Sequence, residues 1–139
     1  MATVKLGDLS KKMARLDVCM MTTKASRGGL SSRPMSNNGD VEYDGNSYFF
    51  TYEDSKVASE LKANKSVSLG FQGKDMLFIT IAGKATLVKS KTRLQQHWLD
   101  ELKMWFKEGI ETTGIIMIHV KADSIKYWHK EEQGEIKVK

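Results

Sequence analysis

Arg33, Ser55 and Lys56 are the residues of this chain whose types and spacing best suit ligand-binding chemistry. The run Asp54–Lys56 stands where an aromatic segment gives way to helical spacing, which predicts a helix N-terminus. Such an end offers free backbone N–H groups and a positive dipole end, to which Ser55 adds a hydroxyl and Lys56 a mobile charge. Arg33, on a nearby predicted strand, adds a planar guanidinium that fits phosphate. The combination predicts an anion site, whereas Asp54–Lys56 alone is more typical of plain helix capping.

Other catalytic and metal-binding patterns do not occur in the sequence. Gly83-Lys84 is not part of a phosphate-binding loop, because Phe78 stands where that motif needs its first glycine. His97, His119 and His129 lie 22 and 10 residues apart without a second cysteine, which is a poor zinc-binding set. His119, on an apolar segment, is more typical of a core or interface histidine. No serine lies in a nucleophile elbow. The catalytic residues are therefore unknown, and we expect no metal site.

Composition and charge exclude several classes of protein. The net charge of +5 makes nucleic acid a candidate partner. However, Lys outnumbers Arg 18 to 4, and the lysines are scattered among acidic residues. This pattern argues against nucleic acid and leaves anionic small molecules as candidate ligands. No apolar run approaches the ~20 residues of a membrane helix, and Met1–Ser10 lacks the pattern of a secretory signal. Cys19, the single cysteine, lies in an apolar run that predicts an inert buried thiol, so we expect a cytoplasmic protein without membrane contact.

Helical and strand-like hydrophobic patterns alternate along the chain. Residues 6–16, 54–63 and 91–106 carry apolar side chains at helical spacing, which predicts three helices. Gly83, inside the longest strand-like segment, predicts a bulge. Hairpin turns join most neighbours, so we expect one domain over residues 1–139 in the mainly β (α+β) class, with an antiparallel sheet closed into a small barrel. Eight strand-like segments predict about six or seven strands: 18–23, 30–36, 48–52, 66–71, 76–89, 115–122, 125–128 and 136–138.

Several motifs together give the chain a family resemblance. In order they are Arg33-Pro34-Met35, Phe49-Phe50-Thr51, Asp54-Ser55-Lys56, Ile79–Ala85, Trp105–Gly109 and Tyr127-Trp128. Each motif alone is weak evidence for a family, but their order and spacing over about residues 6–128 make the family resemblance fairly specific. By these motifs the chain resembles the FMN-binding split β-barrels of the pyridoxamine 5'-phosphate oxidase-like family, within its general stress protein branch.

The resemblance implies a homodimer with FMN in the cleft between subunits, FAD being the alternative flavin. By the resemblance, Arg33, Ser55 and Lys56 would hold the ribityl phosphate. Main-chain groups of the segment Pro34, Met35 and Ser36, with the Thr51 hydroxyl, would face the flavin ring and ribityl chain. Trp98, Trp105 and Phe106 would close the cleft, although core packing is an equal interpretation for Trp98 and Phe106.

Three departures from the family pattern limit the functional prediction. Val57 replaces a second basic residue that often follows Lys56, and Glu111–Gly114 replaces an acidic, proline-containing turn. No arginine follows Arg93, so the basic C-terminal substrate-binding stretch of true pyridoxamine-phosphate oxidases is missing. We therefore expect an oxidoreductase-like, stress-related flavoprotein that does not oxidise pyridoxamine phosphate.

Three other functions remain open from the sequence. The first is a flavin-binding or flavin-sequestering protein without catalysis. The second is a haem-binding split barrel, for which His119 or His129 would be the ligand to test. The third is a basic nucleic-acid binder built on an unrelated small barrel.

Overall fold

A computed structural model describes residues 6–13, 16, 18–25, 27–36 and 43–138 of the chain. In these residues the backbone forms one seven-stranded antiparallel sheet accompanied by α-helices and short 3-10 helices. The strands are β1 (Val18–Lys24), β2 (Leu30–Ser36), β3 (Asn46–Tyr52), β4 (Ser66–Gln72), β5 (Leu77–Val88), β6 (Ile115–His129) and β7 (Glu132–Lys137). The helices are α1 (Leu6–Met13), α2 (Lys56–Ala63), α3 (Lys91–His97), η1 (Asp100–Met104) and η2 (Gly109–Glu111). The predicted α+β class is confirmed.

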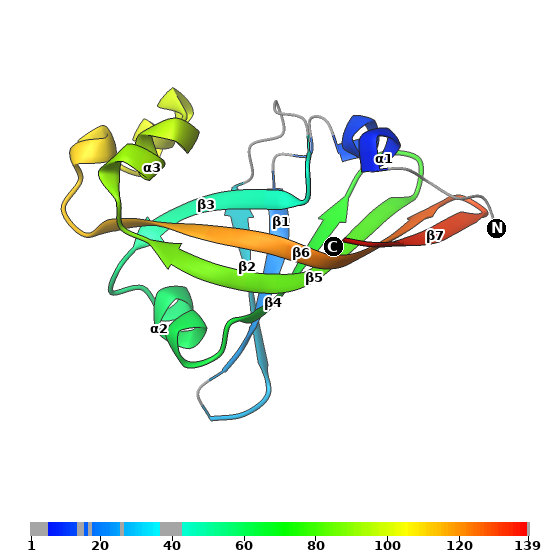
Figure 1. The fold of residues 1–139 in the computed structure, drawn as a ribbon, viewed down its shortest axis with the longest axis horizontal. Helices are drawn as coiled ribbons and strands as arrows, with labels where there is room; N and C mark the ends of the chain where they lie inside the picture. The colour runs from blue at the N-terminus through cyan, green and yellow to red at the C-terminus, as the bar shows by residue number, and fades with distance from the viewer. Residues whose placement is uncertain (1–5, 14–15, 17, 26, 37–42, 139) are drawn as a thin grey trace.

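The sheet is a split barrel rather than a closed one. Its strands follow the order β2-β1-β4-β5-β6-β3, and β7 pairs with the remaining part of β6. Within the described residues no ladder joins β2 to β3, so these two strands are the ends of the main strand order and each has a free edge. Helix α2 packs against β1 and β5, while α3 lies at the opposite end of the molecule from β7 (Figure 1). The closed barrel expected from strand count alone is thus corrected to an open one, as the family resemblance implied.

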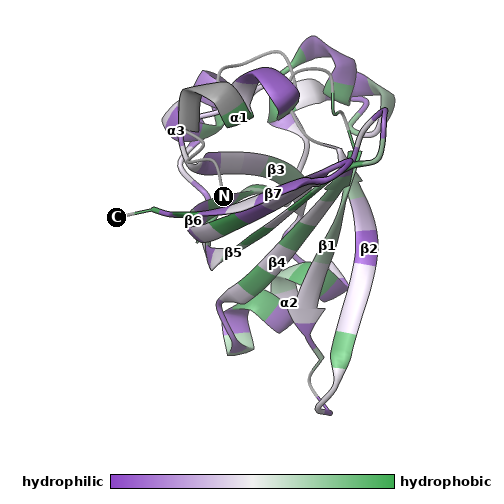
Figure 2. Cartoon of the chain, turned by 90° about the vertical axis from the view of Figure 1, so that its right-hand side faces the viewer, coloured by the Kyte–Doolittle hydropathy of each residue, from purple (hydrophilic) through white to green (hydrophobic). Residues whose placement is uncertain are grey.

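The strand predicted over residues 76–89 bends where its glycine stands. The β5–β6 register shifts between Ala82 and Gly83, which confirms the predicted bulge. A Cβ atom on Gly83 would lie 2.3 Å from the Lys121 carbonyl oxygen, so no larger residue fits without moving backbone. The bulge increases the twist of the sheet, and Figure 2 shows the strands fanning apart.

Two predicted segments at the C-terminal end are one strand. Residues 115–122 and 125–128 belong to β6, which runs unbroken through the polar pair Asp123-Ser124. The strand continues because its partner changes: β3 pairs with residues 115–121, and β7 pairs with residues 124–129. The prediction of separate strands was wrong because a polar pair inside a strand resembles a turn when its partners are unknown.

The long helix predicted over residues 91–106 is also divided. Helix α3 ends at His97, Trp98 has extended backbone angles (φ −69°, ψ 138°), and η1 begins at Asp100. The Trp98 ring makes edge contacts with Phe50 and Phe106. These aromatic contacts accompany the break and outweigh the helical spacing of the sequence.

The interior contains a large and a small hydrophobic cluster. The large cluster lies between the concave face of the sheet and helices α1 and α2, and it includes the predicted inward residues Val67, Leu69 and Phe71. The small cluster is formed by Val88, Leu94 and Met117 with partly buried neighbours. Figure 2 shows the matching alternation of apolar and polar positions along the strands. No helix among the described residues is long and apolar enough to cross a membrane.

Candidate functional site

A groove of about 330 Å³ lies where the two free edges of the sheet approach each other. This volume is at the lower end of the range typical of small-molecule sites. The groove brings together five residues predicted from the sequence: Pro34, Met35, Ser36, Thr51 and Trp105. Its other lining residues are Phe50, Tyr52, Leu102 and Phe106, of which Phe106 was predicted either to close the cleft or to pack in the core. The sequence placed these four residues in motifs or on helical faces. It did not predict Tyr52 or Leu102 as site residues, because their place in the groove depends on how η1 is placed relative to β3.

An aromatic wall closes one side of the groove. The rings of Tyr52 and Phe106 lie 5.1 Å apart, and Phe106 in turn contacts Trp98. Phe106 is buried, so its predicted alternative role in core packing applies. Trp98 supports this wall from behind and does not line the groove. Trp105 is 65% exposed and presents a free aromatic face at the rim.

The N-terminus of α2 lies directly beside this groove. Ser55, not Asp54, is the N-cap, and its Oγ accepts hydrogen bonds from the Ala58 N–H (3.3 Å) and from the Thr51 hydroxyl (3.1 Å). Because Ser55 Oγ is the acceptor in both bonds, its own hydrogen remains available to a ligand. Lys56 begins the helix with an exposed side chain that has no acidic partner in the described part of the chain. These groups form an anion-compatible corner connected to the groove through Thr51.

Val57 shows why the second basic residue of the family pattern has no equivalent here. Its side chain is 5% exposed and belongs to the large hydrophobic cluster. A charged side chain at this position would have to leave the core, at a considerable cost in desolvation. The anion-compatible corner therefore depends on Lys56 and the helix N-terminus.

Arg33 does not line the groove with the other predicted residues. Its guanidinium points toward α2, where Nη2 forms an ion pair with Glu60 Oε1 at 2.7 Å. Further hydrogen bonds run to Thr23, Ser31 and the Met21 carbonyl oxygen. Sequence reasoning missed Glu60, although its place between the inward-facing Ala58 and Leu61 is a signal that its carboxylate lies near the core.

The histidines occupy positions away from the groove. Tyr48 lies between His97 and His119, with ring centroids 3.5 and 4.8 Å away, and His119 Nε2 lies 2.8 Å from Asn46 Oδ1. Burial and the nearby Arg93 charge lower the pKa of both histidines below the usual value. This stack holds α3 against β3 and β6. It depends on strand register, which the sequence does not reveal.

Reactive-thiol and metal chemistry find little support in the described residues. Cys19 is buried, and burial raises the pKa of its thiol to about 12, so the thiol stays protonated at neutral pH. No group of three His, Cys, Asp or Glu side chains in the described segments could hold a metal ion. The groove is therefore the stronger candidate for a functional site.

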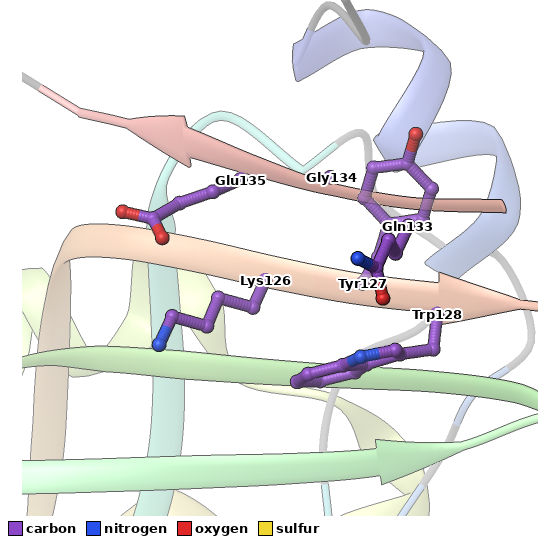
Figure 3. A pocket seen from close by; sticks show the side chains of 6 residues that line it. All are labelled: Lys126, Tyr127, Trp128, Gln133, Gly134 and Glu135. Atoms are coloured by element: carbon purple, nitrogen blue, oxygen red, sulfur yellow. The ribbon is translucent and has the colours of Figure 1, made fainter. Parts of the chain in front are cut away.

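Two other hollows lie near the β6–β7 hairpin. Figure 3 shows the first, of about 190 Å³, in which Tyr127 and Trp128 leave β6 on opposite sides. Its other lining residues are Lys126, Gln133, Gly134 and Glu135. The second, of about 530 Å³, is lined by Lys12, His129, Lys130, Glu131 and Glu132 and has no aromatic wall. Neither contains a residue predicted to bind flavin, although the second contains His129, the candidate ligand of the haem-binding alternative.

Comparison with known proteins places this geometry in a family. Residues 5–139 match the family model described as pyridoxamine 5'-phosphate oxidase like. The chain belongs to this family. Comparison with curated protein sequences gave no significant match.

Solved structures share the fold at low sequence identity. General stress protein 26 from Bacillus anthracis has a TM-score of 0.75 and 20% identity, over 94% of this chain and 98% of that one. A pyridoxamine 5'-phosphate oxidase-related, FMN-binding protein from Nostoc punctiforme has a TM-score of 0.70 and 11% identity, over 100% of both chains. A haem-binding protein from Mycobacterium smegmatis has a TM-score of 0.77 and 9% identity, over 99% of this chain and 60% of that one. At these identities the likeness establishes the fold.

Proposed function

We propose that this chain is a flavin-binding protein, with FMN as its ligand in the groove between β2 and β3. The observation that carries the proposal is that an apolar, aromatic groove adjoins a cationic corner at Ser55 and Lys56, where Lys56 has no acidic partner among the described residues. A flavin has both matching parts, a flat aromatic ring system and a phosphate. The Nostoc punctiforme neighbour, described as FMN-binding, supports the proposal at the level of the family.

The groove residues would hold the two parts of the ligand differently. The ring would lie along the backbone of Pro34, Met35 and Ser36, opposite the aromatic wall and Trp105. The Thr51 hydroxyl would contact the ribityl chain, while Ser55 and Lys56 would hold the phosphate through hydrogen bonds and charge. Trp98 would act indirectly, by supporting Phe106. FAD presents the same flavin, ribityl and phosphate portion, so it is the alternative ligand.

A bound flavin supplies hydride or electron transfer, and the protein supplies orientation and electrostatics. Among the described residues that line the groove, Tyr52 alone has a titratable side chain. We therefore infer an oxidoreductase-like protein in which no side chain acts as a strong general acid or base. Oxidation of a reduced nicotinamide cofactor by the FMN-loaded protein would support catalysis. Its absence would support flavin storage or sequestration.

A homodimer is part of the proposal. Tyr52 and Trp105 are 40% and 65% exposed at the rim of the groove, so one chain leaves much of the ligand in solvent. A second subunit placed against this rim would complete the enclosure. Light scattering is expected to give about twice the monomer mass of 15.7 kDa. A mass near that of the monomer would remove the shared site from the proposal.

The visible spectrum of the purified protein, followed by titration with FMN, tests the proposed function. We expect flavin absorption bands and saturable binding with one FMN per chain. A Soret band would favour the haem-binding alternative, which the Mycobacterium smegmatis neighbour raises. No described residue that lines the groove is a histidine, and His129 lines the separate hollow near the β6–β7 hairpin, so this alternative has less structural support in the groove. Absence of FMN binding to the folded protein would contradict the proposal.

A further inference from the structure

Glu60 is a buried carboxylate on α2 with an unusual set of partners. Its side chain is 3% exposed. Oε1 accepts hydrogen bonds from Arg33 Nη2 at 2.7 Å and from the Thr23 hydroxyl at 2.9 Å. Oε2 is buried and has no hydrogen-bond partner in the part of the chain that the structure describes. A buried carboxylate is normally paired with all of its oxygens satisfied, so the free oxygen requires an explanation.

The terminal nitrogens of the Arg33 guanidinium donate all of their hydrogens to protein acceptors. Nη1 donates to the Met21 carbonyl oxygen at 3.3 Å and to the Thr23 hydroxyl at 2.9 Å. Nη2 donates to the Ser31 hydroxyl at 2.9 Å and to Glu60 at 2.7 Å. Each of the four terminal hydrogens therefore has an acceptor. The side chain is only 20% exposed, and its charge is balanced inside the protein.

The Arg33–Glu60 pair is held by the same helix whose N-terminus forms the corner that would hold the phosphate. Side chains alternate along a strand, so Arg33 projects from the same face of β2 as Met35, which lines the groove. Glu60 is five residues after the N-cap Ser55 on the same helix, or about 7–8 Å along its axis. The pair is thus close enough to the corner to alter the charge that a phosphate meets there.

We propose that Glu60 is a specificity-determining residue of the flavin site, acting through Arg33. By neutralising Arg33, Glu60 removes one positive charge from the phosphate end and adds an unpartnered carboxylate oxygen nearby. The site therefore favours a doubly charged phosphate monoester over an uncharged flavin less strongly than a free arginine would allow. Arg33 is a positioning residue in this arrangement, and Lys56 with the α2 N-terminus carries phosphate recognition. This inference rests on the proposed function.

A set of four proteins separates this role from direct phosphate binding by Arg33: the wild type, Arg33→Gln, Glu60→Gln and Arg33→Gln/Glu60→Gln. Each is titrated calorimetrically with FMN and with riboflavin, which lacks the phosphate. Glu60→Gln should raise the ratio of FMN to riboflavin affinity by about ten-fold or more, because the arginine charge is released. The double variant should return that ratio to within about two-fold of the wild type. Arg33→Gln alone should lower it, because Glu60 is then uncompensated.

Glu135→Gln is the matched control. It removes the same charge from an exposed ion pair with Lys137 on β7, away from the groove, and should leave the ratio unchanged. Urea unfolding without ligand checks that each variant folds. Arg33→Gln and Glu60→Gln should each lower stability more than the double variant does, because a buried pair is damaged most when one partner remains. Gln keeps an oxygen that can accept from Arg33, which favours folding of Glu60→Gln.

The outcomes distinguish this inference from the proposed function. If the wild type binds FMN and folded Glu60→Gln binds it no better relative to riboflavin, the inference is overturned and the proposed function stands. Loss of the FMN preference in the double variant would also overturn it, because Arg33 would then be a direct phosphate ligand. If the wild type fails to bind FMN but Glu60→Gln binds it, the inference is supported. Failure of every variant to bind either flavin contradicts both proposals.

Discussion

The groove between β2 and β3 and the hollow between β6 and β7 contain similar residues, but the polar groups beside them are paired differently. Each has a partly exposed tryptophan, Trp105 at 65% and Trp128 at 38%. In the groove, the neighbouring Lys56 has no described acidic partner, and the Ser55 hydroxyl keeps a free hydrogen. In the β6–β7 hollow, Glu135 is paired with Lys137 at 2.6 Å.

The packing beneath the two regions also differs, because it leaves space for a ligand in the groove and none beside Gly134. Gly134 lies so close to Tyr127 that an added Cβ would be 2.5 Å from the ring, which leaves no space for a ligand at that point. The groove instead lies at a gap in the sheet, where backbone edges and an aromatic wall leave an open volume. An exposed aromatic residue beside unpaired polar groups indicates a binding site, whereas the same residue beside satisfied pairs indicates packing.

The largest expected effect is the loss of phosphate recognition in Lys56→Ala. A charge-assisted hydrogen bond is worth roughly 1.5–3 kcal/mol, so FMN affinity should fall by about ten-fold or more while riboflavin affinity changes little. Calorimetric titration of both ligands measures the contrast. Lys126→Ala, in the β6–β7 hollow, is the control and should change neither affinity. Equal losses of FMN and riboflavin in Lys56→Ala would place the phosphate elsewhere.

Gly134→Ala should have the opposite profile, with lower stability and unchanged FMN affinity. The added methyl group must displace the buried Tyr127 ring, and overpacking of this kind costs about 1–3 kcal/mol. Urea unfolding measures the effect. Gly70→Ala is the matched strand substitution: its Cβ would meet its nearest neighbour at 3.9 Å, so we expect a change within about 0.5 kcal/mol. Similar stabilities for the two variants would refute the packing role of Gly134.

Trp105→Ala should weaken FMN and riboflavin equally, by about three- to ten-fold, because the contact is with the shared ring system. Its exposure means that the melting temperature should hardly change. Trp128→Ala provides the comparison at the other hollow and should leave both affinities at the wild-type value. Fluorescence titration of the flavin is sufficient for this test. A larger loss from Trp128→Ala would reverse the assignment of the two regions.

The smallest expected effect is a pH dependence of stability that originates in the stack of Tyr48, His97 and His119. The pKa values of His97 and His119 are lowered in the folded state, mainly by burial. The unfolded chain therefore binds more protons as the pH falls below about 6.5, and stability declines through that window. Urea unfolding at pH 8 and pH 5.5 should show the decline, and His97→Gln should reduce it. His129→Gln, near β7, serves as the control, and an unchanged slope in His97→Gln would exclude the stack as its source.

Much of the fold follows from local sequence patterns. The alternation of Val67, Leu69 and Phe71, the glycine bulge at Gly83 and the cap at Ser55 each depend on neighbouring residues, and each was predictable. The break at Trp98 was not, because ring contacts with distant residues decide it.

The candidate site was predictable to a similar degree. The motifs identified five residues that the fold brings into one groove, and their roles toward a flavin stay predictions. The partner of Arg33 was not predictable, since Glu60 meets it only through the packing of α2 on β1 and β5. Local patterns specify which residues are available, whereas tertiary packing decides which charges remain free.

Chemical-shift mapping by NMR during an FMN titration tests the central claim most directly. Backbone amide signals should shift in three segments, residues 35–36, 50–56 and 102–106, and should stay unchanged over residues 126–135. Pro34 has no amide, so Met35 and Ser36 report for β2. Shifts concentrated in residues 126–135, or spread evenly over the folded chain, would contradict a flavin site between the edges of the sheet.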